Sequence, residues 1–305
     1  MNPGFGRFAP TPSADLHIGN LRTALVAWLA ARSSGRGFLI RVEDLDTPRL
    51  RNADAIGTRQ LEDLDRLGLV SDVPVIHQRD RAPVYDTALA QLEPLVYECF
   101  CSRKDVAQAT RAPHGSTPRY PGTCRGLSES EKEALRARRQ PCLRINAGCA
   151  HVRITDVLHG VVSADVDDFV VRRADGVFAY NFAVVVDDGL QGVDQVVRGD
   201  DLLESAPRQA WLARQLGFAE PVYLHVPLVH APDGTRLAKR DHAMTLARLR
   251  EAGVGASAVL GHLACSLGLA RPGEPVTLAD LVMRFDPQKL PRDPWYVDPL
   301  IWAQD

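Results

Sequence analysis

The chain has 305 residues and a formal net charge of -2, with 45% apolar and 24% charged residues. These values are typical of a soluble globular protein of one large domain or about two smaller ones, and a near-neutral chain is not expected to coat nucleic acid through charge alone. No stretch approaches the roughly 18–20 apolar residues of a membrane span, and no basic start followed by an apolar run marks a secretory signal. We therefore expect a cytoplasmic protein that has no membrane partner.

The first hundred residues alternate between strand-like and helix-like patterns. In the segment 53–67, for example, Ile56, Leu61 and Leu64 recur on one face of a helix. Strands separated by helices of this length predict a parallel sheet with crossover connections. The predicted strands are 6–9, 38–42 and 73–77, and the predicted helices are 19–33, 53–67 and 84–97.

The alternation stops at Cys99, and residues 102–140 are polar and rich in Arg, Pro and Gly. A strand at 195–197, a helix at 206–216 and a strand at 222–229 resume it, so we interpret the intervening segment as an insertion in one sheet. The antiparallel strands predicted in the insertion are 142–146, 151–157, 169–173 and 178–186, and the helices predicted after the last strand are 244–252, 256–267 and 277–285.

The six cysteines of the chain are too few for a disulfide framework at this length. Two of them, Cys99 and Cys101, are separated by a single residue, which suits metal ligation. We therefore favour a reducing compartment and a metal site, with reduced thiols buried in the core as the alternative.

Two separated motifs suit phosphate binding. His17, Gly19 and Asn20 lie where a strand gives way to a helix, and such a junction presents backbone N–H groups and the positive end of a helix dipole. The second motif, Arg236-Leu237-Ala238-Lys239-Arg240, gathers three cations that could clamp a polyphosphate as negative charge develops. Taken alone, each motif has an ordinary alternative, an exposed histidine before a helix or a solvated basic loop.

Together these motifs resemble the HIGH-like and KMSKS-like signatures of class I aminoacyl-tRNA synthetases. The similarity extends, in chain order over roughly residues 5–245, to the glutamyl branch of that class, through the segments 7–13, 21–25, 41–46, 180–188 and 197–203. It implies an α/β, Rossmann-like parallel-sheet catalytic domain (1–80 and 178–240), an inserted acceptor-type subdomain with a zinc site (81–177) and a short helical C-terminal region (241–305) without an anticodon-binding domain.

The resemblance also implies the roles of individual residues. Arg7 matches the group that grips the substrate carboxylate, Glu43 the group that binds the ammonium, and Tyr180 and Arg198 the remaining glutamate contacts. Further residues of the implied glutamate site are Phe8, Ala9, Pro10 and Thr11. The implied ATP site consists of His17, Gly19, Asn20 and Lys239. The implied catalytic groups are His17, Asn20 and Lys239.

Two positions depart from the family pattern. Asn20 replaces the second histidine of the first motif, so it can donate a hydrogen bond but cannot be cationic. In the second motif, Arg236 and Ala238 replace a lysine and a serine, so the charge is kept and a hydroxyl is lost. We expect these changes to affect the rate of the reaction more than its type.

The length of the chain favours one family within the glutamyl branch. Only about sixty residues follow Asp241, as in the compact glutamyl-queuosine tRNA(Asp) synthetases. That family has a zinc pattern of the kind Cys-x-Cys followed by Tyr-x-x-x-Cys, which implies one structural zinc ion on Cys99, Cys101, Tyr120 and Cys124. His114 is a competing fourth ligand, and Cys142, Cys149 and Cys265 are expected to be core thiols.

The implied reaction has two steps. Without tRNA, L-glutamate is activated by ATP, with accompanying Mg²⁺, to glutamyl-adenylate; the glutamate is then transferred to the queuosine wobble base of tRNA(Asp). We expect a monomer. A basic stretch could contact phosphate or could be a solvated helix face, and its residues are Arg125, Lys132, Arg136, Arg138, Arg139 and Arg144.

Three other functions remain open. A truncated glutamyl-tRNA synthetase would charge tRNA(Glu), and a catalytically weak paralogue would only bind tRNA. A nucleotidyltransferase of small-molecule metabolism could also carry the first motif, although the implied glutamate contacts and the cysteine pattern disfavour it.

Overall fold

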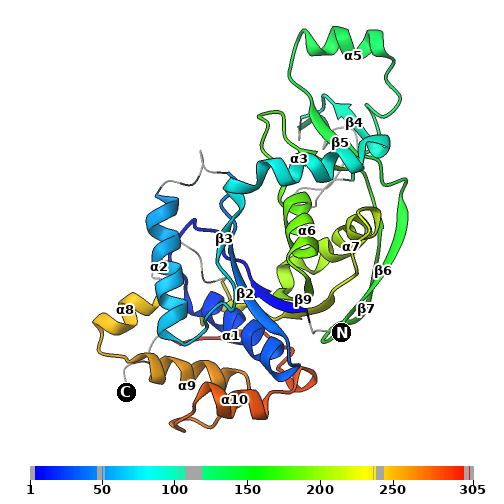
Figure 1. Cartoon of the computed structure of the whole chain (residues 1–305). Helices are drawn as coiled ribbons and strands as arrows, with labels where there is room; N and C mark the ends of the chain where they lie inside the picture. Colours follow the sequence, from blue (N-terminus) through cyan, green and yellow to red (C-terminus); the bar gives the residue numbers. More distant parts are fainter. Residues whose placement is uncertain are drawn as a thin grey trace.

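A computed structural model describes residues 4–46, 50, 52–102, 104–106, 119–235, 237, 244–298 and 302. Its centre is a seven-stranded sheet in the order β3-β2-β1-β9-β10-β6-β7. Neighbouring strands from β3 to β6 pair in parallel, and β6 and β7 form an antiparallel hairpin at one edge (Figure 1). The strands are β1 Phe5–Phe8, β2 Gly37–Val42, β3 Ile76–His77, β6 Ala150–Asp156, β7 Gly160–Val166, β9 Val193–Gly199 and β10 Val222–Val226.

Helices cover both faces of this sheet, because successive side chains of each strand point to opposite sides. On β2, Phe38 and Ile40 join one hydrophobic cluster and Leu39 joins the other. One cluster is formed with α1 Ile18–Ser33, α2 Ala53–Arg66, α8 Leu246–Glu251, α9 Ala256–Ser266 and α10 Leu278–Arg284, and the other with α3 Ala82–Gln91, α6 Tyr180–Leu190 and α7 Ala206–Gln215. The predicted parallel α/β class is thereby confirmed.

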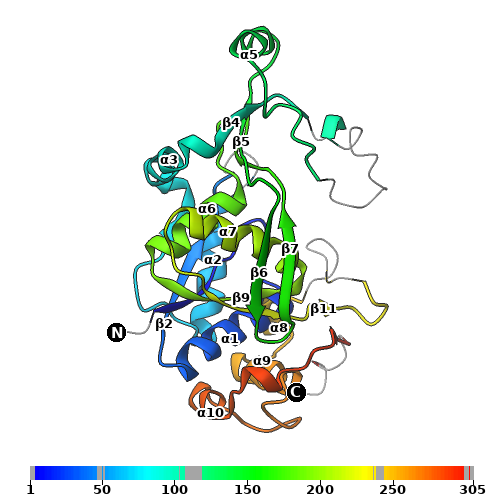
Figure 2. The same cartoon turned by 90° about the vertical axis from the view of Figure 1, so that its right-hand side faces the viewer.

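The inserted segment projects from one end of the molecule, opposite α10 (Figure 2). It contains a three-stranded antiparallel sheet and a third, separate cluster of buried residues that includes Cys99, Tyr120 and Cys124. Its elements are β4 Val96–Cys99, α5 Glu129–Arg136, β5 Cys142–Ile145 and β8 Phe169–Arg172, whereas the strand predicted at 151–157 as part of the insertion is β6 of the central sheet. The remaining two-stranded sheet joins β11 Val229–His230 to β12 Trp295–Tyr296.

Short 3₁₀ helices connect several of these elements, at η2 Gln78–Arg81, η3 Glu93–Leu95, η4 Asp200–Ser205 and η5 Pro287–Lys289. None of the helices in the described part of the chain combines the length and the apolar character that crossing a membrane requires.

The structure corrects two predicted elements. The segment 178–186, predicted as a strand from its run of valines, instead begins helix α6 at Tyr180. Packing overrides the weak helix propensity of valine, because Val184, Val185 and Val186 are all buried between the sheet and neighbouring helices. The helix predicted over 84–97 ends at Gln91 and is followed by η3 and β4, and strand β7 was not predicted.

Candidate active site and cysteine cluster

The carboxyl ends of β1 and β9 open into a cleft of about 570 Å³. Ligands of open parallel sheets bind at this edge, because the loops that follow the strands converge there. Every residue implied by the resemblance for the glutamate and ATP sites lines this one cleft wherever the structure describes it: Arg7, Phe8, Ala9, Pro10, Thr11, His17, Gly19, Asn20, Glu43, Tyr180 and Arg198. Sequence reasoning and structure thus agree on where these side chains meet.

Buried charges form the floor of one end of the cleft. Arg7 is 3% exposed and donates from Nη1 to the carbonyl of Val197 at 3.0 Å and from Nε and Nη2 to Asp188 at 3.4 Å. Arg41 is fully buried and donates to Asp188 at 2.8 Å and to Glu43 at 3.2 Å. The two guanidinium groups therefore face two carboxylates in one network.

The balance of charge in this network sets the protonation of its carboxylates. Burial would raise the pKa of Asp188, but Arg41 and Arg7 outweigh it and lower that pKa. Burial raises the pKa of Glu43, and the same two arginines offset only part of the rise. Burial alone would lower the pKa of Arg41, but Asp188, Glu43 and Asp187 raise it, so Arg41 stays charged. An ammonium group arriving beside Glu43 would favour its ionised form.

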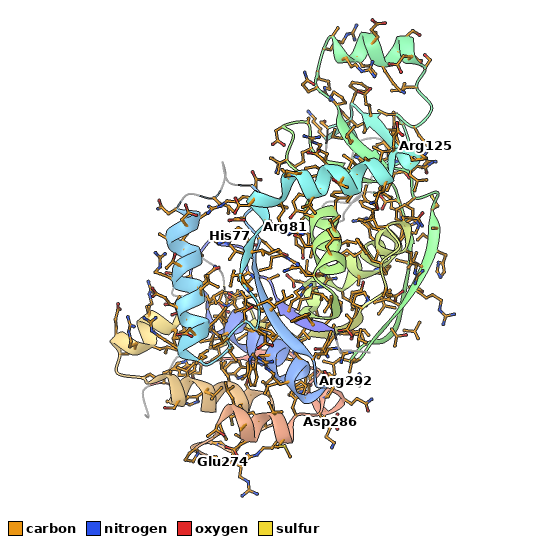
Figure 3. The ribbon with its side chains drawn as sticks, in the orientation of Figure 1. His77, Arg81, Arg125, Glu274, Asp286 and Arg292 are labelled. Atoms are coloured by element: carbon orange, nitrogen blue, oxygen red, sulfur yellow. The ribbon has the colours of Figure 1, made fainter. Side chains whose placement is uncertain are left out.

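Helix α6 supplies the acidic side of this network through two consecutive residues. Asp187 is fully buried and accepts hydrogen bonds from Gln78 at 2.8 Å, from Arg81 at 2.5 Å and from Tyr85 at 2.8 Å, while Asp188 faces Arg7 and Arg41. Figure 3 labels Arg81 at the start of α3, where its side chain reaches α6. We assigned no role from the sequence to Arg41, Asp187 or Asp188, and the one signal available was a pair of aspartates inside an apolar segment.

The other end of the cleft is built by the first motif. The His17 ring accepts at Nδ1 from the backbone N–H of Gly19 at 3.1 Å and of Asn20 at 3.4 Å, and the Asn20 side-chain oxygen accepts from the His17 N–H at 3.2 Å. These bonds form a capping box at the start of α1. Because Nδ1 is an acceptor, the proton of the neutral ring is on Nε2. Asn20 thus has a structural role.

Gly19 is required by the close approach of the ring that caps the helix. A Cβ at this position would lie 2.9 Å from the His17 ring and 3.2 Å from the Val229 side chain. Either distance is too short, so a larger residue would displace the ring from its capping position.

The chain that follows the second motif meets the first motif. Ile18 donates its N–H to the Met244 carbonyl at 3.0 Å, and His17 forms an antiparallel bridge with Thr245. Within the second motif, Leu237 lines the cleft and donates its backbone N–H to the Val229 carbonyl. Lys239, Arg236, Ala238 and Arg240 lie outside the described residues, so their predicted roles have no structural test.

A second cavity, of about 890 Å³, adjoins the cleft and shares Thr11, Glu43 and Tyr180 with it. Polar side chains on its wall include Asp46 and Arg173, which form an ion pair at 2.6 Å. Tyr180, 37% exposed, therefore lies between two connected spaces.

Three of the predicted metal ligands gather in the inserted segment. The sulfur atoms of Cys99, Cys101 and Cys124 lie within 4.8 Å of one another, with 3.6 Å between those of Cys101 and Cys124. A tetrahedron with Zn–S bonds of about 2.3 Å has edges of about 3.8 Å, so the donor set fits a metal ion such as zinc. The Tyr120 hydroxyl lies 3.4 Å from the Cys99 sulfur and 3.9 Å from the Cys101 sulfur, and it accepts the Cys124 N–H at 2.8 Å.

The other cysteines differ from the prediction in part. Cys142 lies opposite Cys99 on the neighbouring strand, but its thiol is directed to the Cys99 carbonyl at 3.3 Å. Cys265 is half-buried, whereas Cys149 is exposed in a turn with a φ of 55°, so its assignment as a core thiol was wrong. His114, the competing ligand, lies outside the described residues.

Ion pairs engage much of the basic stretch that could have contacted phosphate. Arg136 pairs with Glu98 and Glu129, and Arg139 with Asp105. Arg125, labelled in Figure 3, pairs with Asp168, and Arg144 is buried against the Tyr120 ring. Carboxylates of the same chain therefore neutralise most of these arginines, which fits the alternative of a solvated helix face better than a phosphate-binding surface.

Comparison with known proteins agrees with this geometry. Residues 5–292 match the family described as class I tRNA synthetases (E and Q), catalytic domain. A glutamyl-Q tRNA(Asp) synthetase of Nocardia farcinica is 54% identical over 295 residues, with 96% of this chain and 92% of the relative covered. The corresponding relative from Cutibacterium acnes is 48% identical over 283 residues, with coverages of 92% and 81%.

The fold is also similar to a solved structure. A glutamate-tRNA synthetase of Elizabethkingia anophelis superposes with a TM-score of 0.84 at 23% identity, over 99% of this chain and 69% of that one. The sequence matches are closer and define the family. The chain therefore belongs to the class I tRNA synthetases (E and Q) and, among them, to the family of glutamyl-Q tRNA(Asp) synthetases, which makes it a ligase of the aminoacyl-tRNA synthetase type.

Proposed function

We propose that the chain activates L-glutamate with ATP in the absence of tRNA and then transfers the glutamate to the queuosine base of tRNA(Asp). The observation that carries this proposal is the buried network of Arg7, Arg41, Asp188 and Glu43 at one end of the cleft. All four residues belong to this chain, which supports an amino-acid pocket that forms without nucleic acid. A prearranged site of this kind supports catalysis by positioning.

Charge complementarity assigns the amino acid to this end of the cleft. Arg7 and Arg198 present guanidinium groups that suit the side-chain carboxylate of glutamate, and Glu43 suits its ammonium. The α-carboxylate then attacks the α-phosphorus of ATP and releases pyrophosphate. No covalent bond to the protein is needed, because holding the two anions together and stabilising the phosphate charge carry the catalysis.

The first and second motifs form the nucleotide end in this proposal. The start of α1 places the positive end of the helix dipole at this end of the cleft, and His17 carries a proton on Nε2 that can be donated to a phosphate oxygen. Lys239 is proposed to stabilise the transferred charge, with Mg²⁺ neutralising the ATP phosphates. The contacts of His17 and Ile18 with residues 244–245 bring the chain that follows the second motif to the first motif, which supports a joint role of the two motifs.

The second cavity is proposed to receive the acceptor base. It opens onto Thr11, Glu43 and Tyr180, so a nucleoside there would adjoin the activated glutamate. Asp46 and Arg173 on its wall offer hydrogen-bond partners to a diol.

The remaining parts of the proposal concern organisation. Cys99, Cys101, Cys124 and Tyr120 would hold a structural zinc ion that stiffens the inserted segment. We also propose the division into residues 1–80 with 178–240, 81–177 and 241–305, a monomeric state and a cytoplasmic location.

Transfer of labelled glutamate tests the proposed acceptor. The purified chain should label tRNA(Asp) that carries queuosine and leave the same tRNA without queuosine unlabelled. The label should survive removal of the 3′-terminal nucleotide, since the base and not the terminal ribose accepts it. Labelling of unmodified tRNA(Glu) instead would favour a truncated glutamyl-tRNA synthetase, and binding of tRNA with no labelling would favour a paralogue that only binds.

A further inference from the structure

Two buried residues behind the amino-acid pocket have no part in the function described so far. His225 lies on β10 directly opposite Arg198 on β9, so the two side chains leave neighbouring parallel strands at the same level. Arg198 lines the cleft, whereas His225 is fully buried behind it. Asp156, at the end of β6, is 1% exposed and lies on the far side of the His225 ring.

The hydrogen bonds of this chain fix the position of the imidazole proton. Arg198 Nε donates to His225 Nε2 at 2.9 Å, and His225 Nδ1 lies 2.7 Å from Asp156 Oδ2. An arginine side chain can only donate, so His225 Nε2 carries no proton. The ring is therefore neutral with its proton on Nδ1, which donates to the Asp156 carboxylate.

Asp156 is held in place by backbone donors. Its Oδ1 accepts from the N–H groups of Leu158 and His159, both at 2.9 Å, and its Oδ2 also accepts from the His225 N–H at 2.9 Å. Burial would raise the pKa of Asp156, but the His225 bond and these backbone bonds outweigh it and lower the pKa. Asp156 is thus a rigid, ionised acceptor.

The groups that face His225 disfavour its protonation. Burial lowers its pKa most, Asp156 raises it, and the cations or potential cations of Arg198 and His159 lower it further. His159 Nε2 lies 3.2 Å from the His225 carbonyl, and the Tyr223 ring stacks on the imidazole at 19° without adding charge. A proton on Nε2 would also point at the Arg198 N–H and break the bond between them.

His225 is one of three acceptors that orient the Arg198 fork. The other two are Gln209 Oε1, 2.7 Å from Nη1, and the Leu202 carbonyl, 3.3 Å from Nη2. These contacts occupy three of the five guanidinium N–H groups. One N–H on each terminal nitrogen has no partner among the residues that the structure describes, and this pair suits the two oxygens of a carboxylate.

We propose that His225, oriented by Asp156, is a positioning residue that holds the Arg198 fork toward the amino acid, and that protonation of His225 releases the fork. The proposal rests on the proposed function, because it takes glutamate as the ligand of Arg198. Glutamate binding then depends on an atom that does not touch the ligand, the unprotonated Nε2 of His225, which lies behind the pocket.

Two substitutions separate the acceptor from the shape of the ring. His225→Phe removes the acceptor, and His225→Gln can keep an oxygen near the position of Nε2. In glutamate-dependent ATP–pyrophosphate exchange, His225→Phe should raise the KM for glutamate about 10- to 100-fold while leaving the KM for ATP within about twofold. His225→Gln should restore most of the glutamate affinity. Equal defects in both variants, or a normal glutamate KM in His225→Phe, would overturn the proposal.

The pH dependence provides a readout that a purely structural role would not move. In the parent chain, the KM for glutamate should rise as the pH falls through the lowered pKa of His225, below the ordinary value of about 6.5. The Glu43 carboxyl titrates in both proteins, so the comparison with His225→Gln isolates the histidine. The rise of the KM for glutamate at low pH should be smaller in His225→Gln than in the parent chain. An equal rise in both proteins would contradict the proposal.

His151→Gln is the matched control. His151 also lies 2.8 Å from a carboxylate, that of Asp165, but this pair is exposed on the β6–β7 hairpin. The variant should keep the parent KM and pH profile; if it shifts them as His225→Gln does, the effect does not come from Arg198.

Imidazole ¹⁵N chemical shifts of the intact parent test the proposal even if His225→Phe does not fold. At pH 7, His225 should show a protonated Nδ1 and a bare Nε2, whereas an imidazolium or a protonated Nε2 would overturn the proposal. If the parent chain shows no glutamate-dependent exchange, the proposed function is wrong. The tautomer of His225 then still tests whether this residue positions Arg198.

Discussion

In the amino-acid pocket, Arg7 and Arg41 are buried against carboxylates supplied by the same chain, whereas in the cysteine cluster three sulfur atoms lie within 4.8 Å of one another. The pocket draws its residues from β1, β2 and α6, which belong to the central sheet and its covering helices. The cluster draws its residues from the end of β4, from Cys101 just after it and from Tyr120 and Cys124, outside that sheet.

The difference shows two ways of stabilising a buried polar centre. In the pocket, each charge reduces the desolvation cost of its neighbour, so the arrangement is complete before a ligand arrives. In the cluster, thiols that gave up their protons would repel one another until the proposed metal ion joined them, so we expect folding of the inserted segment to be coupled to metal binding. The two regions should therefore respond independently to substitution.

The largest expected effect is the loss of metal from the inserted segment. Cys101→Ser should reduce the bound zinc from about one equivalent to a small fraction, because structural zinc sites depend on all of their ligands and contribute about 10–16 kcal/mol of binding. Metal analysis of the purified variant, with limited proteolysis of the insert, measures this loss.

Cys142→Ser is the control for that experiment, since Cys142 lies beside the cluster with its thiol directed to a carbonyl. It should keep the metal. Loss of zinc in Cys142→Ser, or a parent chain that is metal-free yet folded and active, would contradict the assigned ligand set.

The second effect concerns the buried network of the pocket. Arg41→Leu leaves Asp188 and Glu43 without their main partner and should lower the free energy of unfolding by about 3–5 kcal/mol. Arg59→Ala removes an exposed pair with Asp15 and should cost at most about 1 kcal/mol. Denaturant unfolding of both variants measures the contrast, and similar losses in the two would show that the network contributes no special stability.

The smallest effect comes from Asp63, a buried carboxylate on α2 that lacks such a network. Burial raises its pKa to about 6, because Arg66 offsets only part of the desolvation. The folded chain therefore binds a proton more readily than the unfolded chain between about pH 4 and 6, and Asp63 lowers stability as the pH rises through that range.

Asp63→Asn should accordingly raise the free energy of unfolding by about 1–3 kcal/mol at pH 7 and have little effect at pH 4. Asp188→Asn should act in the opposite direction at pH 7, because the pKa of Asp188 is lowered by Arg41 and Arg7. Unfolding curves at the two pH values decide the matter, and an equal change at both values for Asp63→Asn would refute the pKa argument.

Local patterns predicted the first half of the sheet well. The helix predicted at 53–67 is α2, Ala53–Arg66, and the one predicted at 19–33 is α1, Ile18–Ser33, because apolar periodicity and the chain connections agree there. The segment 178–186 was mistaken for a strand because a valine run is typical of strands, and the burial of residues 182–186 between the sheet and neighbouring helices explains the helix.

The site residues found from the sequence are those that the family motifs contain. Arg41 and Asp188 lie inside the family-like segments 41–46 and 180–188, but those segments do not reveal that the two residues pair, and the His225–Asp156 pair carries no local signal, because the partners lie far apart in the chain. Only the strand order brings β6, β9 and β10 together and aligns Asp156, Arg198 and His225. The role of Lys239 stays a prediction.

The central claim is that the amino-acid pocket is complete without nucleic acid and selects a carboxylate. ATP–pyrophosphate exchange in the absence of tRNA, with glutamate and glutamine compared, tests it most directly. We predict exchange with glutamate and a kcat/KM for glutamine that is lower by about 30-fold or more, since a neutral amide leaves buried guanidinium groups unpaired at a cost of about 2–5 kcal/mol. Equal rates with the two amino acids, or exchange that begins only when tRNA is added, would contradict the claim.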